Sequence, residues 1–525
     1  MAISRNYSLL TAFIILIHFA IFFFLGLFRH WGFITSINDL GVFDQAVSGA
    51  LSYGYLLNTT QLNEQINWLS FHFHPVLYFF VPLYFLFSSP WWFILVQPLA
   101  LSLSAWPIFL IGRHLYQSEQ AGVIWATIFL VNPFLINAAA WDFHPITLAV
   151  PFVALGFWAL LRSSSLILLL SCLFILICQE HLGVMVIGFG ILWWIWTRQW
   201  IPGTVLILLG ATHFYLVLQV IMPAFSPTGQ HVMVSEDLGQ LSRYAWLGDS
   251  IGDIIHTIFT QPFFVLETVL IGMGGLGYLV LLLLPFLFFP LLGLVFLLPG
   301  MADLAANMLS ANPMPRSPIA YHSATLIPIF TIAAMYEVKK ISKWQKRFTA
   351  KELSALALIT TSMMAYAFAP FPLPGAKNVW APASFIALPD SRVQEISSLV
   401  GNEASTSVQA NVGAHFSQRR EIYRYPNQVD RVDAVILWLE SPTQNIHNYP
   451  EDDVESRRYI IGMLDSHLQM DRKDYLASVE ALLLDDEFGV AYWDEPWLVL
   501  KRDIEEKDIV PDVMARLEEL RKKWR

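Results

Sequence analysis

The sequence predicts a mainly α-helical, polytopic membrane protein that ends in a small α/β domain. Of its 525 residues, 56% are hydrophobic, and the mean hydropathy is +0.53. Charged residues make up 14% of the chain, whereas typical soluble domains carry about 25%. Few of these charges precede residue 335, while the sequence after Pro370 has the composition of an ordinary soluble protein. We therefore expect a membrane domain first and a globular domain second.

Twelve apolar segments approach the length of about 20 residues that a membrane-spanning helix needs. Tryptophan and tyrosine gather at many of their ends, as aromatic residues do at membrane interfaces. We expect a transmembrane helical bundle of about 11–13 helices over residues 1–370, beginning with a retained N-terminal anchor. The segments are residues 8–28, 75–88, 91–111, 121–138, 146–161, 166–178, 180–196, 201–222, 263–280, 281–298, 319–336 and 352–369.

The basic residues set the expected orientation. The densest basic connection, Lys339–Arg347, is expected to face the cytoplasm, because cytoplasmic loops are enriched in lysine and arginine. The next segment then carries everything after Pro370 out of the cytoplasm. Counting back along the chain also places the first long polar loop, residues 30–74, outside. We expect a protein of the bacterial inner (plasma) membrane whose C-terminal domain is extracytoplasmic.

The number of segments conflicts with this orientation, because twelve crossings would return the tail to the cytoplasm. One segment is therefore expected not to cross. Either residues 75–111 contain an interfacial or re-entrant piece, or residues 166–196 form one long span. The first alternative places Trp141–Pro145 outside and the second places it inside, and we favour the first.

After the membrane domain, a proline-rich linker at residues 371–395 leads to a soluble α/β domain at residues 396–525. Hydrophobic alternation and helical periodicity predict a strand at VDAVILWLE, a hairpin at VAYWDEPWLVLKR and a final helix at DVMARLEELRKKWR. The net charge of −10 lies largely in this tail, which argues against nucleic-acid binding. The two cysteines, Cys172 and Cys178, share one apolar run and predict no disulfide framework.

The first loop contains the candidate active site. It interrupts the hydrophobic sequence with two acids near its start, Asp39 and Asp44. Asn38 or Asp39 is a candidate N-cap of the helix DQAVSGAL, but capping needs only one side chain. A second carboxylate beside the membrane can act as a general base or coordinate a divalent cation. We therefore expect Asp39 or Asp44 to be catalytic.

Two short sequences, FHFHP and WDFHP, share Phe-His-Pro, and each immediately precedes an apolar run. Proline suits the first turn of a helix, which leaves the histidines to be explained. Side chains two positions apart in an extended segment project to the same side, as His72 and His74 would, and likewise Asp142 and His144. These pairs predict a metal site. The alternative is that they are independent interfacial residues that extend polar tips toward lipid headgroups.

Further polar residues lie at the ends of other apolar runs. Glu180 and His181 separate two of these runs, and an ionisable pair at membrane depth indicates function. A simple turn between two spans would instead leave the pair solvated. We add Glu180 to the expected metal ligands. Arginine suits bidentate phosphate binding, and the candidate substrate-binding residues of the external loops are Arg243, Arg316, Tyr321 and His322.

The chain lacks four sequence motifs that mark well-known classes of enzyme. The chain contains no Walker-type glycine loop, no Ser-His-Asp signature, no HExxH and no dinucleotide fingerprint. Chemistry on soluble nucleotides is therefore not supported.

Six motifs occur in order along the chain: DLGVFDQAVSG, HFHPVLYFFVPLYFLF, WDFHP, Gln179-Glu180, Tyr321-His322 and VQANVGAHFSQRREIYRYP. Together they resemble a family of predicted bacterial membrane proteins, DUF2079, over nearly the whole chain. That family is similar in layout to the GT-C glycosyltransferases, polytopic enzymes that use lipid-phosphate-linked sugars and carry an acidic residue in the first external loop.

The resemblance implies a GT-C-like bundle in which Asp39, or else Asp44, matches the catalytic acid of the first loop. The chain departs from the GT-C pattern in two ways. It has histidines at positions 72 and 74, where those enzymes often have prolines and tyrosine, and its first loop lacks an Asp-x-Asp pair.

The resulting hypothesis is a membrane glycosyltransferase that takes its sugar from a polyprenyl-phosphate-linked donor at the extracytoplasmic face. Asp39 or Asp44 would deprotonate the acceptor hydroxyl group. A divalent cation, magnesium or manganese, held by the histidine and carboxylate set, or else an arginine, would neutralise the leaving lipid phosphate. The alternative is a transporter or lipid flippase that uses Glu180, His181 and the histidine pairs as a proton relay.

Overall fold

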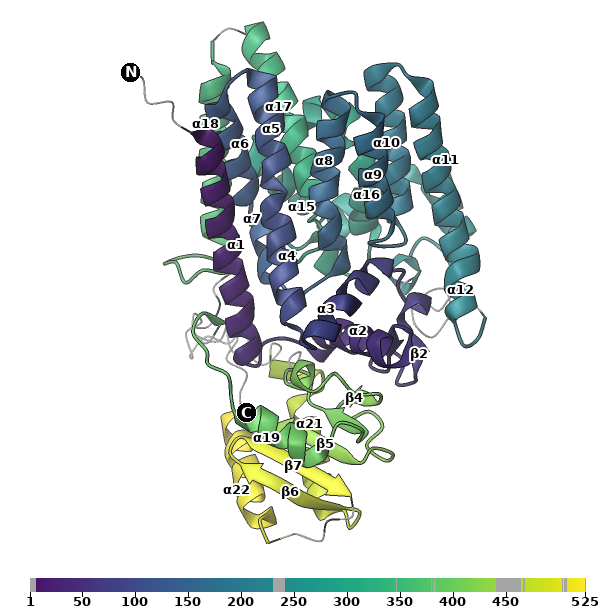
Figure 1. The fold of residues 1–525 in the computed structure, drawn as a ribbon, viewed down its shortest axis with the longest axis vertical. Coiled ribbons are helices and arrows are strands. Elements are labelled where there is room, and N and C mark those ends of the chain that lie inside the picture. The colour runs from purple at the N-terminus through teal and green to yellow at the C-terminus, as the bar shows by residue number, and fades with distance from the viewer. Residues whose placement is uncertain are drawn as a thin grey trace. The chain divides into compact units, whose positions relative to one another are not determined.

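The computed structural model (Figure 1) describes residues 6–229, 241–345, 347–378, 380, 384–440, 464–465, 468–502, 504 and 508–524. Its contacts divide the chain into two compact units. The first unit comprises Met1–Phe23, Leu69–Val76 and Leu95–Asn378, and the second comprises Phe24–Trp68, Leu77–Ile94 and Val379–Arg525. We had expected the first loop to belong to the membrane domain, whereas the structure groups most of it with the C-terminal tail.

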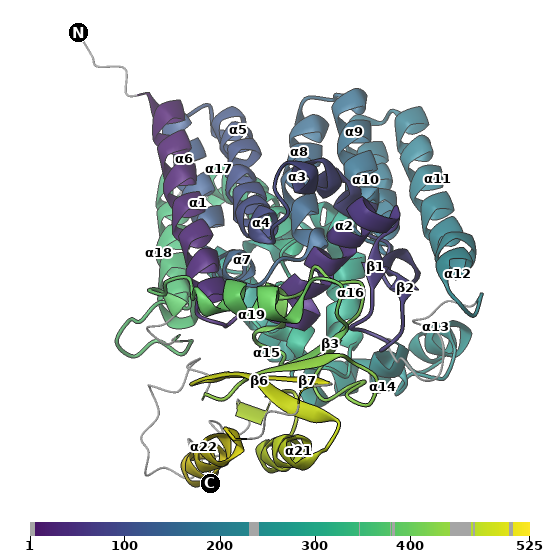
Figure 2. The ribbon, with the colours of Figure 1, turned by 60° about the horizontal axis from the view of Figure 1, so that its bottom comes forward.

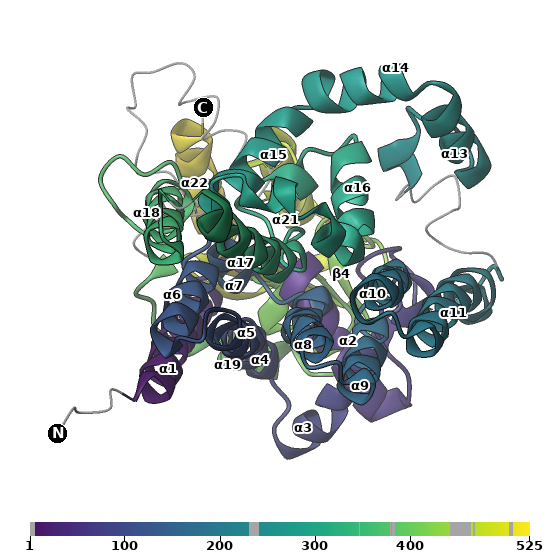
Figure 3. The ribbon, with the colours of Figure 1, turned by 90° about the horizontal axis from the view of Figure 1, so that it is seen from above.

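The first unit consists of helices, several of which Figure 3 shows end-on. Helices suit such apolar sequence because each one satisfies its own backbone polar groups. In chain order the helices are α1 (Tyr7–Trp31), α4 (Trp91–Leu103), α5 (Ala105–Tyr116), α6 (Glu119–Leu130), α7 (Pro133–Ala140), α8 (Val150–Leu161), α9 (Ser165–Leu176), α10 (Leu182–Thr197), α11 (Trp200–Leu216), α12 (Met222–Phe225), α13 (Ile251–Thr260), α14 (Pro262–Glu267), α15 (Gly275–Leu283), α16 (Met301–Leu309), α17 (Leu326–Gln345) and α18 (Ala350–Phe368).

Three helical stretches among the described residues are long and apolar enough to cross a membrane: Tyr7–Trp31, Trp91–Tyr116 and Trp200–Phe225. Two bent pairs would raise this number to five if each pair were one span. One pair is α6 and α7, which meet at 56°. The bend lies where Asn132 caps α7 and Pro133 begins it, so the continuous run predicted at residues 121–138 is broken at a proline.

Two loops of the first unit that carry the shared Phe-His-Pro sequence lie at the same end of its helices. His74 and His144 are close enough for their charges to interact. A third loop joins them, because His72 Nδ1 lies 3.0 Å from Glu180 Oε1. The loops before α8 and before α10 therefore share one end with residues 71–74.

The segments between residues 74 and 141 differ in length. Trp91–Tyr116 is one long apolar helix, and the bent pair α6 and α7 covers residues 119–140. The stretch Pro75–Leu86 is a short apolar helix of 3₁₀ and α turns. The favoured alternative, in which residues 75–111 include a piece that does not cross, stays a prediction.

Helices α10 and α11 pack closely because glycine meets glycine at two levels. A β-carbon on Gly210 would lie 2.4 Å from the carbonyl oxygen of Gly183, and one on Gly203 would lie 2.7 Å from that of Gly190. Small residues permit such close backbone contact between membrane helices. Because Gly183 lies in the first turn of α10, this packing also holds the loop that immediately precedes the helix.

The second unit contains a five-stranded mixed sheet in the order β4-β3-β5-β7-β6. Strand β3 is parallel to both of its neighbours, and β7 is antiparallel to both of its own. The predicted strand at VDAVILWLE and the predicted hairpin at VAYWDEPWLVLKR are confirmed as β5 and as β6 with β7. The strands are β3 (Thr406–Val408), β4 (Ile422–Arg424), β5 (Ala434–Trp438), β6 (Phe488–Asp494) and β7 (Trp497–Arg502).

Helices cover both faces of this sheet (Figure 2). On one face, α21 (Arg472–Leu484) and α22 (Val510–Lys523) pack against alternate strand residues such as Val435 and Leu437. On the other face, α19 (Arg392–Val400) packs against Ile436 and its neighbours. The predicted final helix is thus confirmed as α22. Helix α19 begins inside the predicted linker at residues 371–395, so the folded domain starts earlier than expected.

Two residues of the first loop complete the core on the α19 side. Phe33 and Ile37 are 7% and 0% exposed, and both belong to the cluster that includes Ile436 and Trp497. The Phe33 ring meets the Trp497 ring edge to face at 5.1 Å. Their burial explains why the first loop and the sheet form one compact unit.

The rest of the first loop is largely helical. The Ser36 side chain accepts a hydrogen bond from the Asn38 backbone N–H and begins a π-helical turn at Ile37–Gly41. The alternative in which Asn38 or Asp39 caps this helix is therefore wrong. Helix α2 (Val42–Tyr53) follows and ends at Gly54, whose φ of +81° suits glycine. The unit also contains the short strands β1 (Leu57–Asn58) and β2 (Ile66–Asn67) and helix α3 (Val81–Leu86).

Replacing Ile37 with alanine should destabilise the second unit by about 2–5 kcal/mol, because the change opens a cavity in a filled core. Ile386→Ala is the matched control, since that side chain is 80% exposed and its truncation should change little. Thermal unfolding of the detergent-solubilised protein, followed by proteolysis of the C-terminal region, measures the difference. Equal melting temperatures for the two variants would contradict a role for Ile37 in this core.

Candidate functional site

The first candidate site is centred on Asp44, in the first turn of α2. The preceding π-helical turn and the left-handed Gly54 define the ends of this helical segment. Asp44 is 1% exposed and lies within a continuous run of buried residues, Val42 to Val47. A carboxylate so placed requires hydrogen-bond donors, because burying it without partners is costly.

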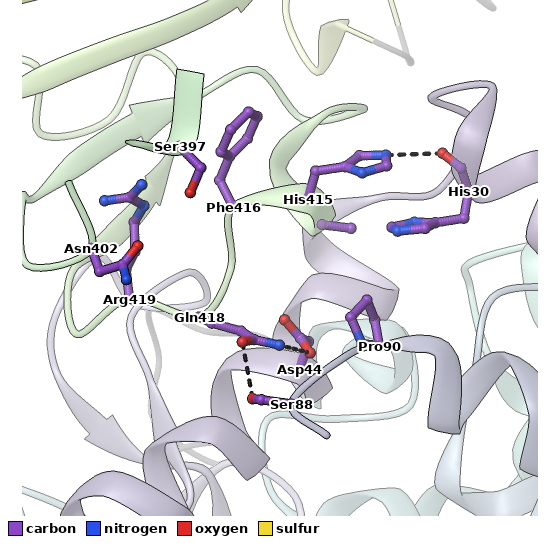
Figure 4. Close-up of a pocket in the computed structure, with 11 residues that line it drawn as sticks. His30, Asp44, Ser88, Pro90, Ser397, Asn402, His415, Phe416, Gln418 and Arg419 are labelled. Carbon is purple, nitrogen blue, oxygen red and sulfur yellow. Dashed lines mark hydrogen bonds between the residues drawn. The ribbon is translucent and has the colours of Figure 1, made fainter. Parts of the chain in front are cut away.

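Three donors satisfy the Asp44 carboxylate. The Tyr84 hydroxyl, from α3, donates to Oδ1 at 2.6 Å, and Gln418 Nε2 donates to the same oxygen at 3.0 Å. The Ser417 hydroxyl donates to Oδ2 at 2.6 Å. Figure 4 shows the contact with Gln418, whose own Oε1 accepts from Ser88. Both carboxylate oxygens are therefore fixed in direction.

Burial raises the pKa of Asp44 from its ordinary value of 3.8 to about 6. The hydrogen bonds from Ser417, Tyr84 and Gln418 favour the charged form and oppose this shift, but they do not cancel it. A carboxyl group with a pKa this close to neutrality can both accept and return a proton near physiological pH.

Asp44 lines a cavity of about 300 Å³ within the second unit (Figure 4). Its walls are mainly polar. The His415 ring stacks on that of His30 with centroids 3.9 Å apart, and His415 Nε2 lies 2.9 Å from the His30 carbonyl oxygen. The cavity is lined by His30, Asp44, Ser88, Pro90, Ser397, Asn402, Ala414, His415, Phe416, Gln418 and Arg419.

Arg419 brings positive charge to the same cavity. Its side chain is 5% exposed, and burial lowers its pKa to about 10, so the guanidinium remains charged at neutral pH. Nη1 donates to the backbone carbonyls of Gly401 and Ala404. The cavity therefore holds a carboxyl group and a fixed cation.

Asp39, the other acid of the first loop, has a different setting. It lies half-buried in the π-helical turn, where its backbone N–H bonds to the Ser36 carbonyl. It is not among the residues that line the described cavity. Of the two predicted catalytic acids, the structure therefore favours Asp44.

The second candidate site lies in the first unit, where the structure brings His72, His74 and Glu180 together. One potential ligand atom from each residue lies within 4.8 Å of the others. Both oxygens of Glu180 contact the histidine loop, Oε1 at 3.0 Å from His72 Nδ1 and Oε2 as acceptor from the Phe73 N–H at 3.0 Å. His74 and Glu180 are each 4% exposed.

Electrostatics distinguishes the members of this group. Burial lowers the pKa of His74 well below its usual value, and the neighbouring His72 adds to this effect. Burial opposes ionisation of Glu180, yet the adjacent His72 holds the pKa of that carboxyl below its usual value. A neutral imidazole and an ionised carboxylate are the forms that bind metals.

A second histidine–carboxylate contact adjoins this group. His181 follows Glu180 in the chain, and its Nε2 lies 3.2 Å from Asp303 Oδ1. The Thr325 hydroxyl donates to Oδ2 of the same carboxylate. Asp303 is 4% exposed, so these two partners help offset the burial of its charge.

The other predicted metal ligands, Asp142 and His144, lie outside the group of three found among the described residues. His144 Nδ1 contacts the Asp142 backbone carbonyl at 2.9 Å, and the His144 ring stacks on Tyr321 at 3.5 Å. Tyr321 in turn stacks on His322 at 4.2 Å. Two of the predicted substrate-binding residues thus belong to an aromatic stack with His144.

The two predicted arginines differ in their surroundings. Arg316 is 7% exposed, and its guanidinium donates to the backbone carbonyls of Met273, Asn307, Met308 and Ser310. This is a helix-capping role at the end of α16, and we assign Arg316 to structure rather than to phosphate binding. Arg243 lies half-buried in a 3₁₀ turn, Leu241–Tyr244.

Several site residues were not predicted from the sequence. Ser417, Gln418 and Arg419 lie in the stretch VQANVGAHFSQRREIYRYP, which carried part of the family resemblance but suggested no chemical role. Tyr84 lies in an apolar run and was read as part of a membrane segment. Gln97 also escaped notice, although its side-chain oxygen accepts from the His144 N–H at 2.8 Å.

The chain belongs to the family of predicted membrane proteins DUF2079, whose model matches residues 29–473. No curated protein matches the chain. The chain is similar to the crystal structure of ArnT from Cupriavidus metallidurans bound to undecaprenyl phosphate, with 11% identity, a TM-score of 0.49 and coverage of 95% of this chain and 98% of that chain. For the apo state of ArnT from the same organism the values are 12%, 0.46, 95% and 98%. Similarity at this level establishes no shared activity, and the GT-C-like architecture stays a prediction.

Asp44→Asn should stabilise the folded protein at neutral pH. The folded-state pKa of about 6 exceeds the ordinary 3.8, so wild-type Asp44 contributes its full stability below about pH 4 and loses it as the pH rises through about 6. Asparagine has no charge to bury, so the variant should gain about 2–3 kcal/mol over the wild type at pH 8 and little at pH 4. Melting temperatures measured from pH 4 to pH 8 test this. A less stable variant at pH 8 would contradict it.

Proposed function

We propose that this protein is a membrane glycosyltransferase that moves a sugar from a polyprenyl-phosphate-linked donor to an acceptor hydroxyl group, with Asp44 as the general base. One observation carries the proposal: a buried carboxyl group with a pKa near 6, oriented by three donors, lines a polar cavity. Membership of a family of membrane proteins supports a lipid-linked donor over a soluble one.

The cavity supports a small polar substrate. Its volume of about 300 Å³ is at the lower end of the range for ligand pockets, which suits one sugar ring better than a nucleotide sugar. Serine, asparagine, glutamine and histidine side chains in its wall match the hydroxyl groups of a sugar. Arg419 lines the same cavity, and in the proposed reaction its charge would neutralise the anionic leaving group.

In the proposed reaction, an Asp44 oxygen takes the proton of the acceptor hydroxyl. The hydroxyl oxygen then forms a bond to the anomeric carbon of the donor sugar. The bond between that carbon and the phosphate oxygen breaks, and the lipid phosphate leaves with the electron pair. Asp44 returns its proton to solvent and is ready for another cycle.

We further propose that the reaction takes place at the extracytoplasmic face of the bacterial inner membrane. The basic residues of Lys339–Arg347 lie mostly in the last turns of α17, and they support a cytoplasmic position for that end. Helix α18 follows in the chain and precedes the linker.

A proton-coupled transporter or flippase is the second candidate. The observation that favours it is the succession of two histidine–carboxylate contacts in the first unit, His72 with Glu180 and His181 with Asp303. Groups of this kind mark proton paths in membrane proteins. Proton uptake by proteoliposomes, without release of sugar from any lipid donor, would favour this candidate over the transferase.

Asp44→Asn should lower the rate of sugar transfer by about 10²–10⁴-fold, because it removes the base and keeps the shape of the side chain. Asp39→Asn is the matched control: it changes the other first-loop acid, outside the cavity, and should leave the rate nearly unchanged. The assay uses purified protein in liposomes with a panel of polyprenyl-phosphate monosaccharides, each labelled in the sugar, and follows label leaving the lipid phase. Near-normal transfer by Asp44→Asn would rule out Asp44 as the base.

The rate of transfer should also depend on pH through Asp44. The base must be ionised, so kcat/KM should fall about tenfold for each pH unit below about 6 and level off above it. Initial rates measured from pH 4.5 to pH 8 give the profile. A rate that stays level down to pH 4.5 would instead indicate a carboxylate with its ordinary pKa and would exclude the buried Asp44.

A further inference from the structure

We propose that His72, His74 and Glu180 form a binding site for a divalent transition-metal ion of the zinc class. The three residues come from two loops of the first unit, and their potential ligand atoms lie within 4.8 Å of one another. The inference goes beyond the proposed transfer reaction and holds whether or not Asp44 is the base.

The two loops are held together independently of any ion. The Val76 N–H donates to the Ile177 carbonyl at 3.0 Å, and the Phe73 N–H donates to Glu180 Oε2 at 3.0 Å. These bonds lie on either side of His74. A site whose loops are joined by a backbone bond, and whose carboxylate is oriented by a backbone N–H, is preorganised, so a metal would meet its ligands without a large rearrangement.

The two imidazoles of the group lie side by side. The His72 and His74 rings lie nearly parallel, at an interplanar angle of 14° with centroids 5.1 Å apart. This agrees with the rule that alternate residues of an extended segment project to one side. Pro75 immediately begins a 3₁₀ helix, which limits the freedom of the backbone beside His74.

Charge gives a physical reason for a cation at this point. Glu180 is 4% exposed, and its nearest side-chain partner is the imidazole of His72. A buried carboxylate is costly unless a charge of opposite sign compensates it. A divalent ion between Glu180 and the two imidazoles would supply that charge.

The donor set selects the class of metal. Two imidazole nitrogens and one carboxylate are ligands of zinc and related transition metals, whereas magnesium prefers oxygen donors and retains its water. We had expected magnesium or manganese and a set of five ligands that included Asp142 and His144. The three residues brought together here instead favour zinc over magnesium, and three protein ligands leave a position open for water or another small ligand.

The test uses the full-length, tag-free protein in detergent, stripped of metal with a chelator. Titration with Zn²⁺ in a calorimeter should give one equivalent of tight binding, and millimolar Mg²⁺ should not compete. Co²⁺ bound at the same site should give visible absorption bands that Zn²⁺ removes. Zn²⁺ should also raise the melting temperature of the wild-type protein, because the ion binds the folded site.

His72→Ala, His74→Ala and Glu180→Gln should each weaken Zn²⁺ binding by at least about 10–100-fold, since losing even an outer partner of a metal ligand has an effect of that size. His256→Ala is the matched control, because this exposed histidine lies in α13, outside the group. If the wild-type protein binds less than about a tenth of an equivalent of Zn²⁺, that result alone overturns the proposal. Equal affinity in His74→Ala and His256→Ala would overturn it as well.

Discussion

The burial of the Asp44 carboxylate is the constraint on which the second unit depends. A buried carboxylate is tolerated when its oxygens accept hydrogen bonds, and each donor lost would leave an oxygen without its partner. The donors come from α3, through Tyr84, and from a segment far along the chain, through Ser417 and Gln418. Donors from α3 and from the segment between β3 and β4 therefore converge on one carboxylate of α2.

Features that depend on local signals could be predicted from the sequence. Hydrophobic length predicted the helices of the first unit, and alternation of apolar residues predicted β5 and the β6–β7 hairpin. Polar residues in an otherwise apolar chain singled out Asp44, His72, His74 and Glu180, because such residues are costly beside a membrane and are seldom placed there without a use. These residues could therefore be predicted from the sequence, whereas the residues that contact them could not.

Features that depend on contacts between distant segments could not be predicted. Tyr84 and Ser417 are 40 and 373 residues from Asp44 along the chain. Nothing in the sequence around either residue indicates its hydrogen bond to Asp44. Phe33 and Ile37 follow an apolar run and resemble its continuation, although they fill the core beside the sheet. The alternation rule placed Asp142 and His144 on one side of their loop but could not reveal that His144 would stack on Tyr321.

The two buried carboxylates of this protein show how their partners determine what each can do. The partners of Asp44 are neutral donors, which do not fully offset burial, so its pKa rises to about 6 and its proton is exchangeable near neutral pH. The partners of Glu180 include imidazoles, which hold its pKa below the usual value and keep it ionised. A carboxyl group of the first kind suits proton transfer, and one of the second kind suits binding of a cation. Because the two environments shift the pKa values in opposite directions, they assign different chemistry to two side chains of the same type.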